Sequence, residues 1–238
     1  MNPLESQTIR LIDRFGKPND IKFSVDPIDS SGPIALTEAG QEYNLTIDEF
    51  AVDTIVLDCG AGYGEFSIEC ELKGARKILS FEPNTTIVKY LNSNTSNFPE
   101  IQICPVGVWI ESKNSYLYLR ETGTASASIH EIQFDPKSKL GLERSRQQIK
   151  LINLGSCIDE TIRSYPQFDI VVKLDIEGAE HEVTEFLAAT GRLRSIKKLW
   201  IEYHFGQQDI PVLLNMEYGA ISLDEKSLGL GLITAKRQ

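Results

Sequence analysis

The spacing of hydrophobic residues changes near residue 54. In residues 4–15, apolar side chains recur at the spacing of an amphipathic helix, which the Gly16-Lys17-Pro18 run would end. Residues 21–49 alternate loosely between apolar and polar and are broken by proline and glycine, which predicts short strands and turns. We therefore expect residues 1–50 to form an N-terminal cap, with one helix and short strands, on a domain built by residues 51–238.

From residue 54 onward, short apolar runs alternate with amphipathic stretches. Buried strands are predicted at residues 54–60, 77–82, 101–109, 168–176 and 197–204. Helices are predicted at residues 65–72, 85–94, 180–190 and 210–219, and a closing hairpin at residues 220–225 and 230–237. This order predicts an α/β fold with a doubly wound, mostly parallel sheet and a late antiparallel edge strand. Ligands of such sheets bind beyond the carboxyl ends of the strands.

One polar segment interrupts this alternation. Residues 116–119 predict an extra strand, and residues 121–150 are rich in serine, lysine and glutamine. We expect this insert to be the least ordered part of the domain.

Composition narrows the class of protein. The chain has 24 Lys and Arg against 34 Asp and Glu, a net charge of −10, which disfavours a protein devoted to binding nucleic acid. Its four cysteines show no CxxC spacing, so we do not expect a zinc knuckle. We expect the protein to reside in a reducing compartment. With no apolar run approaching ~18 residues and no signal-type N-terminus, we expect a cytoplasmic protein without membrane contact.

A glycine-rich turn follows the first buried strand. Residues 58–64 read Asp-Cys-Gly-Ala-Gly-Tyr-Gly, a GxGxG spacing that lets the backbone approach a ligand closely. Glu82, at the end of the next strand, is placed to accept hydrogen bonds from ribose hydroxyls. An acid at residue 58 would repel a pyrophosphate but suits a ligand with an amino group or a sulfonium. S-adenosylmethionine carries both groups.

These motifs resemble those of the FkbM-type family of S-adenosylmethionine-dependent methyltransferases. The resemblance rests on "VLDCGAGYGEFS", "ILSFEPN", "VVKLDIEGAEHEV" and "WIEYH", and covers about residues 54–205. It implies a Rossmann-like class I methyltransferase fold with a seven-stranded sheet. The implied activity is O-methylation of a hydroxyl on a sugar or small secondary metabolite.

The resemblance also implies site residues. Asp58, Gly60, Gly62 and Glu82 are its cofactor contacts. Five neighbours in the same loops join this expected set: Ala61, Pro83, Asn84, Val106 and Gly107. The family's second signature corresponds here to Asp175, Glu177, Gly178, Glu180, Glu202 and His204.

The second signature lies at the ends of two strands expected to be neighbours. Because side chains alternate faces, we predict a buried ion pair between Lys173 and Glu202. Asp175, Glu177 and His204 are the candidate catalytic residues, with Asp175 or His204 as the base that takes the acceptor's proton. Structural positioning of the loop is the alternative role for this cluster. No metal is predicted, although Asp175 and Glu177 leave Mg²⁺ as an option.

Three rival functions remain. A nucleic-acid methyltransferase is disfavoured by the acidic charge and by the absence of a [DNS]PP[YFW] tetrapeptide. A protein that binds S-adenosylmethionine without catalysis, as a partner subunit, is the second, and a dehydrogenase, disfavoured by the glycine spacing, is the third. The expected partner is a small hydroxylated acceptor. The sequence does not fix the oligomeric state.

Overall fold

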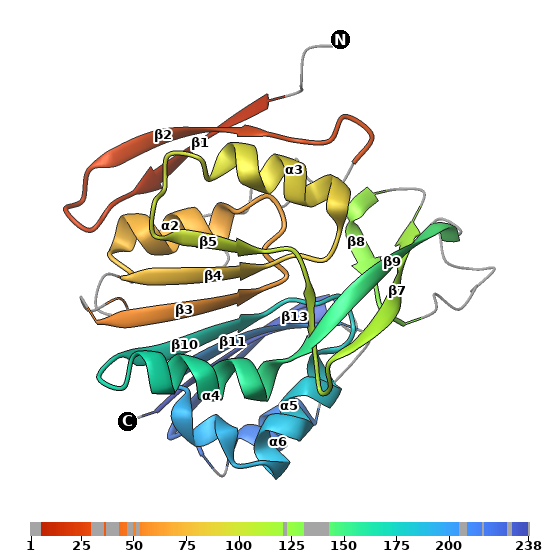
Figure 1. Ribbon diagram of the computed structural model, residues 1–238. Coiled ribbons are helices and arrows are strands. Elements are labelled where there is room, and N and C mark those ends of the chain that lie inside the picture. Colours follow the sequence, from red (N-terminus) through yellow and green to blue (C-terminus); the bar gives the residue numbers. More distant parts are fainter. Residues whose placement is uncertain are drawn as a thin grey trace.

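The centre of the molecule is a seven-stranded sheet (Figure 1). The computed structural model describes residues 6–29, 36, 43–46, 50, 53–120, 123–130, 143–204, 209–215, 217–227 and 230–237. The strand order is β12-β13-β11-β10-β3-β4-β5. Their bounds are β3 Thr54–Cys59, β4 Lys77–Phe81, β5 Ile101–Cys104, β10 Asp169–Leu174, β11 Lys198–Tyr203, β12 Ala220–Ser227 and β13 Leu230–Lys236.

The pairing of these strands confirms the expected doubly wound, Rossmann-like α/β fold. Strands β5, β4, β3, β10 and β11 run parallel. Strand β13 runs opposite to both of its neighbours. One detail differs from expectation, because the reversed strand is second from the edge and β12 forms the edge. A tight connection makes β12 and β13 a hairpin, and β13 then pairs with β11 along its other side.

Helices cover both faces of the sheet (Figure 1). The helices are α2 Glu65–Lys73, α3 Thr85–Asn94, α4 Leu154–Ser164, α5 Glu180–Ala189 and α6 Ile210–Leu214, with a 3₁₀ turn, η2, at Arg192–Ser195. Alternate residues of β10 serve opposite faces: Val171 packs with Phe66 of α2, and Val172 packs with Val183 of α5. Helices α2, α3 and α5 confirm the predictions, α6 is shorter than predicted, and α4 was not predicted.

The N-terminal cap is a β-hairpin, so the prediction of a helix over residues 4–15 is wrong for the described part. Strands β1 (Ser6–Ile12) and β2 (Pro18–Ser24) pair antiparallel. Along β1, Ile9 and Leu11 are buried while Arg10 and Ile12 are exposed, a period of two that the helical interpretation overlooked. The hairpin packs its buried face against side chains of α2 and α3.

A second, four-stranded sheet lies beyond the carboxyl ends of β3 and β4 (Figure 1). Its order is β6-β9-β7-β8, with bounds β6 Gly107–Trp109, β7 Lys113–Arg120, β8 Gly123–Ser128 and β9 Glu143–Asn153. The single strand predicted at residues 101–109 is therefore two strands in two sheets, because Pro105 cannot continue the backbone ladder. The polar insert also contributes ordered pairing through β8 and β9, and its residues 131–142 lie outside the described part.

Candidate active site

The glycine loop joins β3 to α2 and is fixed by its backbone. Gly60, Gly62 and Gly64 have φ angles of 83°, 54° and 94°, a region that favours glycine. The N–H groups of Gly60 and Ala61 both donate to the carbonyl of Phe81, at 3.0 and 2.9 Å. A Cβ on Gly60 would lie 1.7 Å from the carbonyl oxygen of Asp175, so the glycine loop touches the loop that follows β10.

Glu82 follows β4 and is held by the neighbouring backbone. Its Oε2 accepts from the N–H of Gly62 at 3.2 Å, and its Oε1 accepts from the N–H of Asn84 at 2.8 Å. Burial raises the pKa of Glu82 to about 7, against the opposing effect of these two hydrogen bonds. Asn84 in turn caps α3 by accepting from the N–H of Thr86.

The remaining predicted cofactor residues lie at the same edge of the sheet. Val106 lies between β5 and β6, two residues after β5 ends, and Gly107 begins β6. Gly107 packs against Pro83, since a Cβ placed on it would lie 3.5 Å from that ring. The structure therefore brings together the loops after β3, β4 and β5, which we call the cofactor side of the site.

Asp58, a predicted cofactor contact, lies in β3 just before the glycine loop. Its side chain is fully buried. It accepts a 2.5 Å hydrogen bond from Ser67 Oγ and lies 3.5 Å from Lys173 Nζ. Burial raises the pKa of Asp58 despite the nearby ammonium. Asp58 thus supports the glycine loop from inside the protein.

Lys173 connects the two halves of the site. Its Nζ donates to the carbonyl of Gly60 at 2.7 Å and lies 3.1 Å from Asp175 Oδ2. Burial disfavours its charge, but Asp175, then Asp58, raise its pKa above the ordinary value. The prediction of a Lys173–Glu202 ion pair is wrong. In the register of β10 and β11, Lys173 lies opposite Trp200, two residues before Glu202, and its ammonium lies with the two aspartates instead.

Glu202 instead joins a polar group with the N-terminal cap. Its Oε1 lies 3.2 Å from Lys226 Nζ of β12, and its Oε2 lies 3.3 Å from the hydroxyl of Tyr43. That hydroxyl is also 3.5 Å from Asp175 Oδ2, and the Tyr43 ring lies 5.6 Å from Lys173 Nζ. Sequence reasoning missed Tyr43, because nothing in its local pattern separates it from the other apolar positions of the cap.

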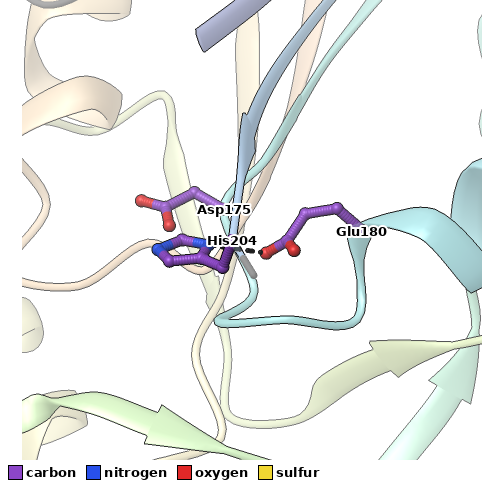
Figure 2. Close-up of side chains that lie close together, drawn as sticks. All are labelled: Asp175, Glu180 and His204. Atoms are coloured by element: carbon purple, nitrogen blue, oxygen red, sulfur yellow. Dashed lines mark hydrogen bonds and ion pairs between the residues drawn. The ribbon is translucent and has the colours of Figure 1, made fainter. Parts of the chain in front are cut away.

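Asp175, Glu180 and His204 converge at the ends of β10 and β11 (Figure 2). His204 Nδ1 lies 3.2 Å from Glu180 Oε1, and His204 Nε2 lies 3.6 Å from Glu177 Oε2. The completely buried Glu180 carboxylate also accepts from the N–H groups of Ile176 and Gly178. We call these loops after β10 and β11 the acceptor side of the site.

Charge coupling on the acceptor side shifts two pKa values. Burial opposes the charge of His204, but the hydrogen bond to Glu180 and the charges of Glu177, Glu180 and Asp175 raise its pKa to about 10. Burial alone would raise the pKa of Asp175, yet Lys173 and then His204 lower it. The acceptor side therefore pairs the ionised Asp175 with an imidazolium and an ammonium.

The second sheet reaches the acceptor side through Ser128. Its Oγ donates to the carbonyl of Glu177 at 2.6 Å and accepts from the N–H of His130 at 3.2 Å. Glu177 has a φ of 58°, which is rare for a residue with a Cβ. The buried Ser128 hydroxyl thus stabilises an unfavourable backbone conformation at a candidate catalytic residue.

Comparisons with known proteins show only distant likeness. The chain matches no protein-family model and no curated protein sequence. Among solved structures it is similar to a T. thermophilus 16S rRNA N2 G1207 methyltransferase in complex with AdoMet and guanosine, with 15% identity and a TM-score of 0.42. That match covers 99% of this chain but 52% of the other, so this chain spans about half of that protein's length.

Two further structures give similar values. A precorrin-6y C5,15-methyltransferase from Geobacter metallireducens is 12% identical, with a TM-score of 0.40, covering 90% of this chain and 93% of the other. An rRNA methylase from Streptococcus thermophilus is 11% identical, with a TM-score of 0.43, covering 81% of this chain and 92% of the other. These likenesses concern the course of the backbone. None of the helices in the described ranges is long and apolar enough to cross a bilayer.

Proposed function

We propose that this protein is an S-adenosylmethionine-dependent methyltransferase that methylates a hydroxyl oxygen of a small acceptor. The observation that carries the proposal is the contact between the glycine loop and Glu82. The backbone N–H of Gly62 donates to the carboxylate of Glu82. This hydrogen bond holds the glycine loop, which a ligand can approach closely, beside the acid that would bind the ribose. A Cβ on Gly62 would lie in ordinary van der Waals contact with the carboxylate of Glu65, 3.5 Å away, so this acid lies beside the loop.

The residues present fit this cofactor better than a dinucleotide. Glu65 lies in the first turn of α2, where a dinucleotide-binding protein seats its pyrophosphate. Asp58 lies beneath the same turn. Two acids there oppose a pyrophosphate and favour a ligand of net positive charge. Gly60, Ala61 and Gly62 would hold the methionine part, and Glu82, Pro83, Asn84, Val106 and Gly107 the nucleoside.

S-adenosylmethionine, when bound, supplies an electrophilic methyl carbon on a sulfonium. Held beside an acceptor oxygen, this group would supply the methyl carbon, with the thioether S-adenosylhomocysteine as the leaving group. The acceptor hydroxyl loses its proton to Asp175, to solvent, or to His204 in its neutral form. Glu177 lies beside them and orients the acceptor. Alignment of the reactants is worth roughly 7–11 kcal/mol, against about 3–5 kcal/mol for proton transfer, so positioning is the larger contribution of these residues.

Calorimetric titration with S-adenosylmethionine, S-adenosylhomocysteine and NAD⁺ tests the cofactor. We expect binding of the first two only, weakened about 10–100-fold in Glu82→Ala because two hydrogen bonds to a charged group are lost. Glu71→Ala is the matched control, since this half-buried acid near the other end of α2 accepts a hydrogen bond from the N–H of Glu100. Equal affinity in both variants, or binding of NAD⁺ alone, would overturn the proposal.

The acceptor is tested by screening hydroxylated small molecules beside an unmodified RNA pool, with mass spectrometry of the products. Transfer to small hydroxyl compounds supports the proposal. Faster transfer to RNA would instead assign the nucleic-acid activity. Cofactor binding with no transfer to any acceptor would favour a non-catalytic partner subunit.

A further inference from the structure

A cluster of three different metal-ligating side chains lies on the acceptor side. Asp175, Glu180 and His204 each offer one atom, and these atoms lie within 4.8 Å of one another (Figure 2). They come from three separate points of the backbone: the loop after β10, the first residue of α5 and the residue after β11. The side chain of Glu180 is completely buried, whereas that of Asp175 is 25% exposed, so the cluster opens toward solvent on one side only.

Two of these side chains are oriented before any ion arrives. Glu180 is fixed by the N–H groups of Ile176 and Gly178, and it still has lone pairs to donate because a carboxylate offers about four acceptor sites. Asp175 is fixed through Oδ2 by Lys173, and among the described residues its Oδ1 accepts no hydrogen bond. A ligand set that needs no rearrangement loses little conformational entropy on binding.

The charges near the cluster leave a deficit that a divalent ion would fill. Asp58 and Asp175 contact the ammonium of Lys173, and Glu177 and Glu180 contact His204, so within the described ranges four carboxylates share two cationic side chains. Binding of the metal displaces the proton of the His204 imidazolium, so one positive charge is replaced by two at this poorly solvated place. One divalent cation supplies the opposite charge and replaces water for all three ligands at once.

We propose that Asp175, Glu180 and His204 bind one divalent transition-metal ion, which holds the acceptor through its oxygen. One imidazole nitrogen with two carboxylates suits Mn²⁺, Fe²⁺ or Zn²⁺ better than Mg²⁺, which prefers oxygen ligands alone. The site differs from the Asp175–Glu177 pair considered from the sequence. The ion's use in catalysis rests on the proposed methyl transfer, because an ion at this place lowers the pKa of the hydroxyl it contacts.

Metal binding is measured directly on the untagged, chelator-treated full chain with Mn²⁺ alone and no cofactor. We expect one equivalent of bound Mn²⁺ by electron paramagnetic resonance, with affinity at least about 100-fold lower in Asp175→Asn and His204→Gln. The matched control is Asp159→Asn, which changes an acid of α4 that pairs with Arg192 and belongs to neither side of the site. Its affinity should match wild type.

A second measurement needs no variant, in case the substitutions disturb folding. Electron spin echo modulation of Cu²⁺- or Mn²⁺-loaded wild-type protein should show coupling to an imidazole nitrogen. The proposal is overturned if no Mn²⁺ binds up to millimolar concentration. It is also overturned, with an adventitious ion only, if the bound ion shows no nitrogen coupling or if all three substitutions weaken binding equally. Cofactor binding is titrated separately with chelator present, so failure of the metal site and failure of the methyltransferase proposal give different results.

Discussion

The cofactor side and the acceptor side of this site are stabilised by different forces. On the cofactor side, backbone N–H groups fix the glycine loop and both oxygens of Glu82. On the acceptor side, charged side chains fix one another, with Lys173 between two aspartates and His204 between two glutamates. Backbone geometry therefore holds the cofactor side in place, and charge balance holds the acceptor side. Substitutions on the two sides should therefore differ in their effects.

The largest effect is expected from removing the ammonium that joins the halves. Lys173→Met leaves Asp58 and Asp175 without their cation, and breaking a buried pair in this way costs about 3–5 kcal/mol of unfolding free energy. Urea denaturation measures this loss. Lys226→Met is the control, because its pair with Glu202 is more exposed and should contribute less than about 1 kcal/mol. Equal losses in the two variants would contradict a central role for charge balance.

Steric contact on the cofactor side predicts the next effect. In Gly60→Ala the new Cβ would lie 1.7 Å from the carbonyl oxygen of Asp175, so the backbone must move. In Gly62→Ala the nearest atom would be 3.5 Å away, and only the left-handed conformation is strained. We expect thermal denaturation to show a loss of roughly 1–3 kcal/mol for Gly62→Ala and a larger loss for Gly60→Ala. Similar stability of both variants would mean that the loops after β3 and β10 are not in close contact.

Glu82 links geometry to pH. Its pKa is about 7, so the carboxylate form becomes dominant as the pH rises from 6 to 8. This is the form that accepts hydrogen bonds from both ribose hydroxyls. Affinity for S-adenosylmethionine should increase roughly 10-fold over this interval by calorimetry, and not in Glu82→Gln. Glu71→Gln should keep the increase, although burial also raises the pKa of Glu71 to about 7. A pH-independent wild type would contradict this role of Glu82.

The same group affects the stability of the free protein with the opposite sign. The folded protein holds the Glu82 proton more tightly than the unfolded chain, whose carboxyl keeps the ordinary pKa of 4.5. The stabilisation it contributes is present below about pH 4.5 and is lost as the pH rises through about 7. Urea denaturation of wild type and Glu82→Gln across this range would show the difference.

The smallest effect concerns the contact between the two sheets. Ser128→Ala removes one hydrogen bond to the carbonyl of Glu177, worth about 1 kcal/mol. We expect kcat/KM for the acceptor to fall roughly 5-fold while the affinity for the cofactor stays unchanged. Ser96→Ala, which removes a surface hydroxyl bonded to Ser93, should change neither quantity. A loss of cofactor affinity in Ser128→Ala would show that the second sheet serves the whole site.

The sequence predicted the central sheet because buried parallel strands have a strong local pattern. Strands β3, β4 and β10 are short apolar runs, and the glycine turn marks the end of the first. The cap was less predictable, since Ile9 and Ile12 are spaced as in a helix whereas Ile9 and Leu11 are spaced as in a strand. Pro105 was visible, but only the structure shows that the chain changes sheets there.

The placement of the candidate site residues in the fold was easier to predict than their contacts. The sequence placed Asp175, Glu177 and His204 at the ends of neighbouring strands. The partner of Lys173 could not be predicted, because it depends on register, and a shift of two residues along β11 separates Trp200 from Glu202. The anchoring of Glu180 by backbone N–H groups, and the approach of Tyr43 and Ser128, depend on tertiary contacts between distant segments.

The pairing of β3 with β10 also has a consequence for how the chain acquires its structure. Thr54 lies beside Asp169 and Asp58 beside Lys173, so the middle of the sheet joins segments separated by most of the domain. Such long-range pairing is slow, because the ends of a long loop must meet before any contact stabilises them. During synthesis, β3, β4 and β5 emerge well before β10 does. The contacts that hold Asp58, Gly60 and Asp175 together therefore form only when the two halves of the sheet meet, and a half-made chain has no site.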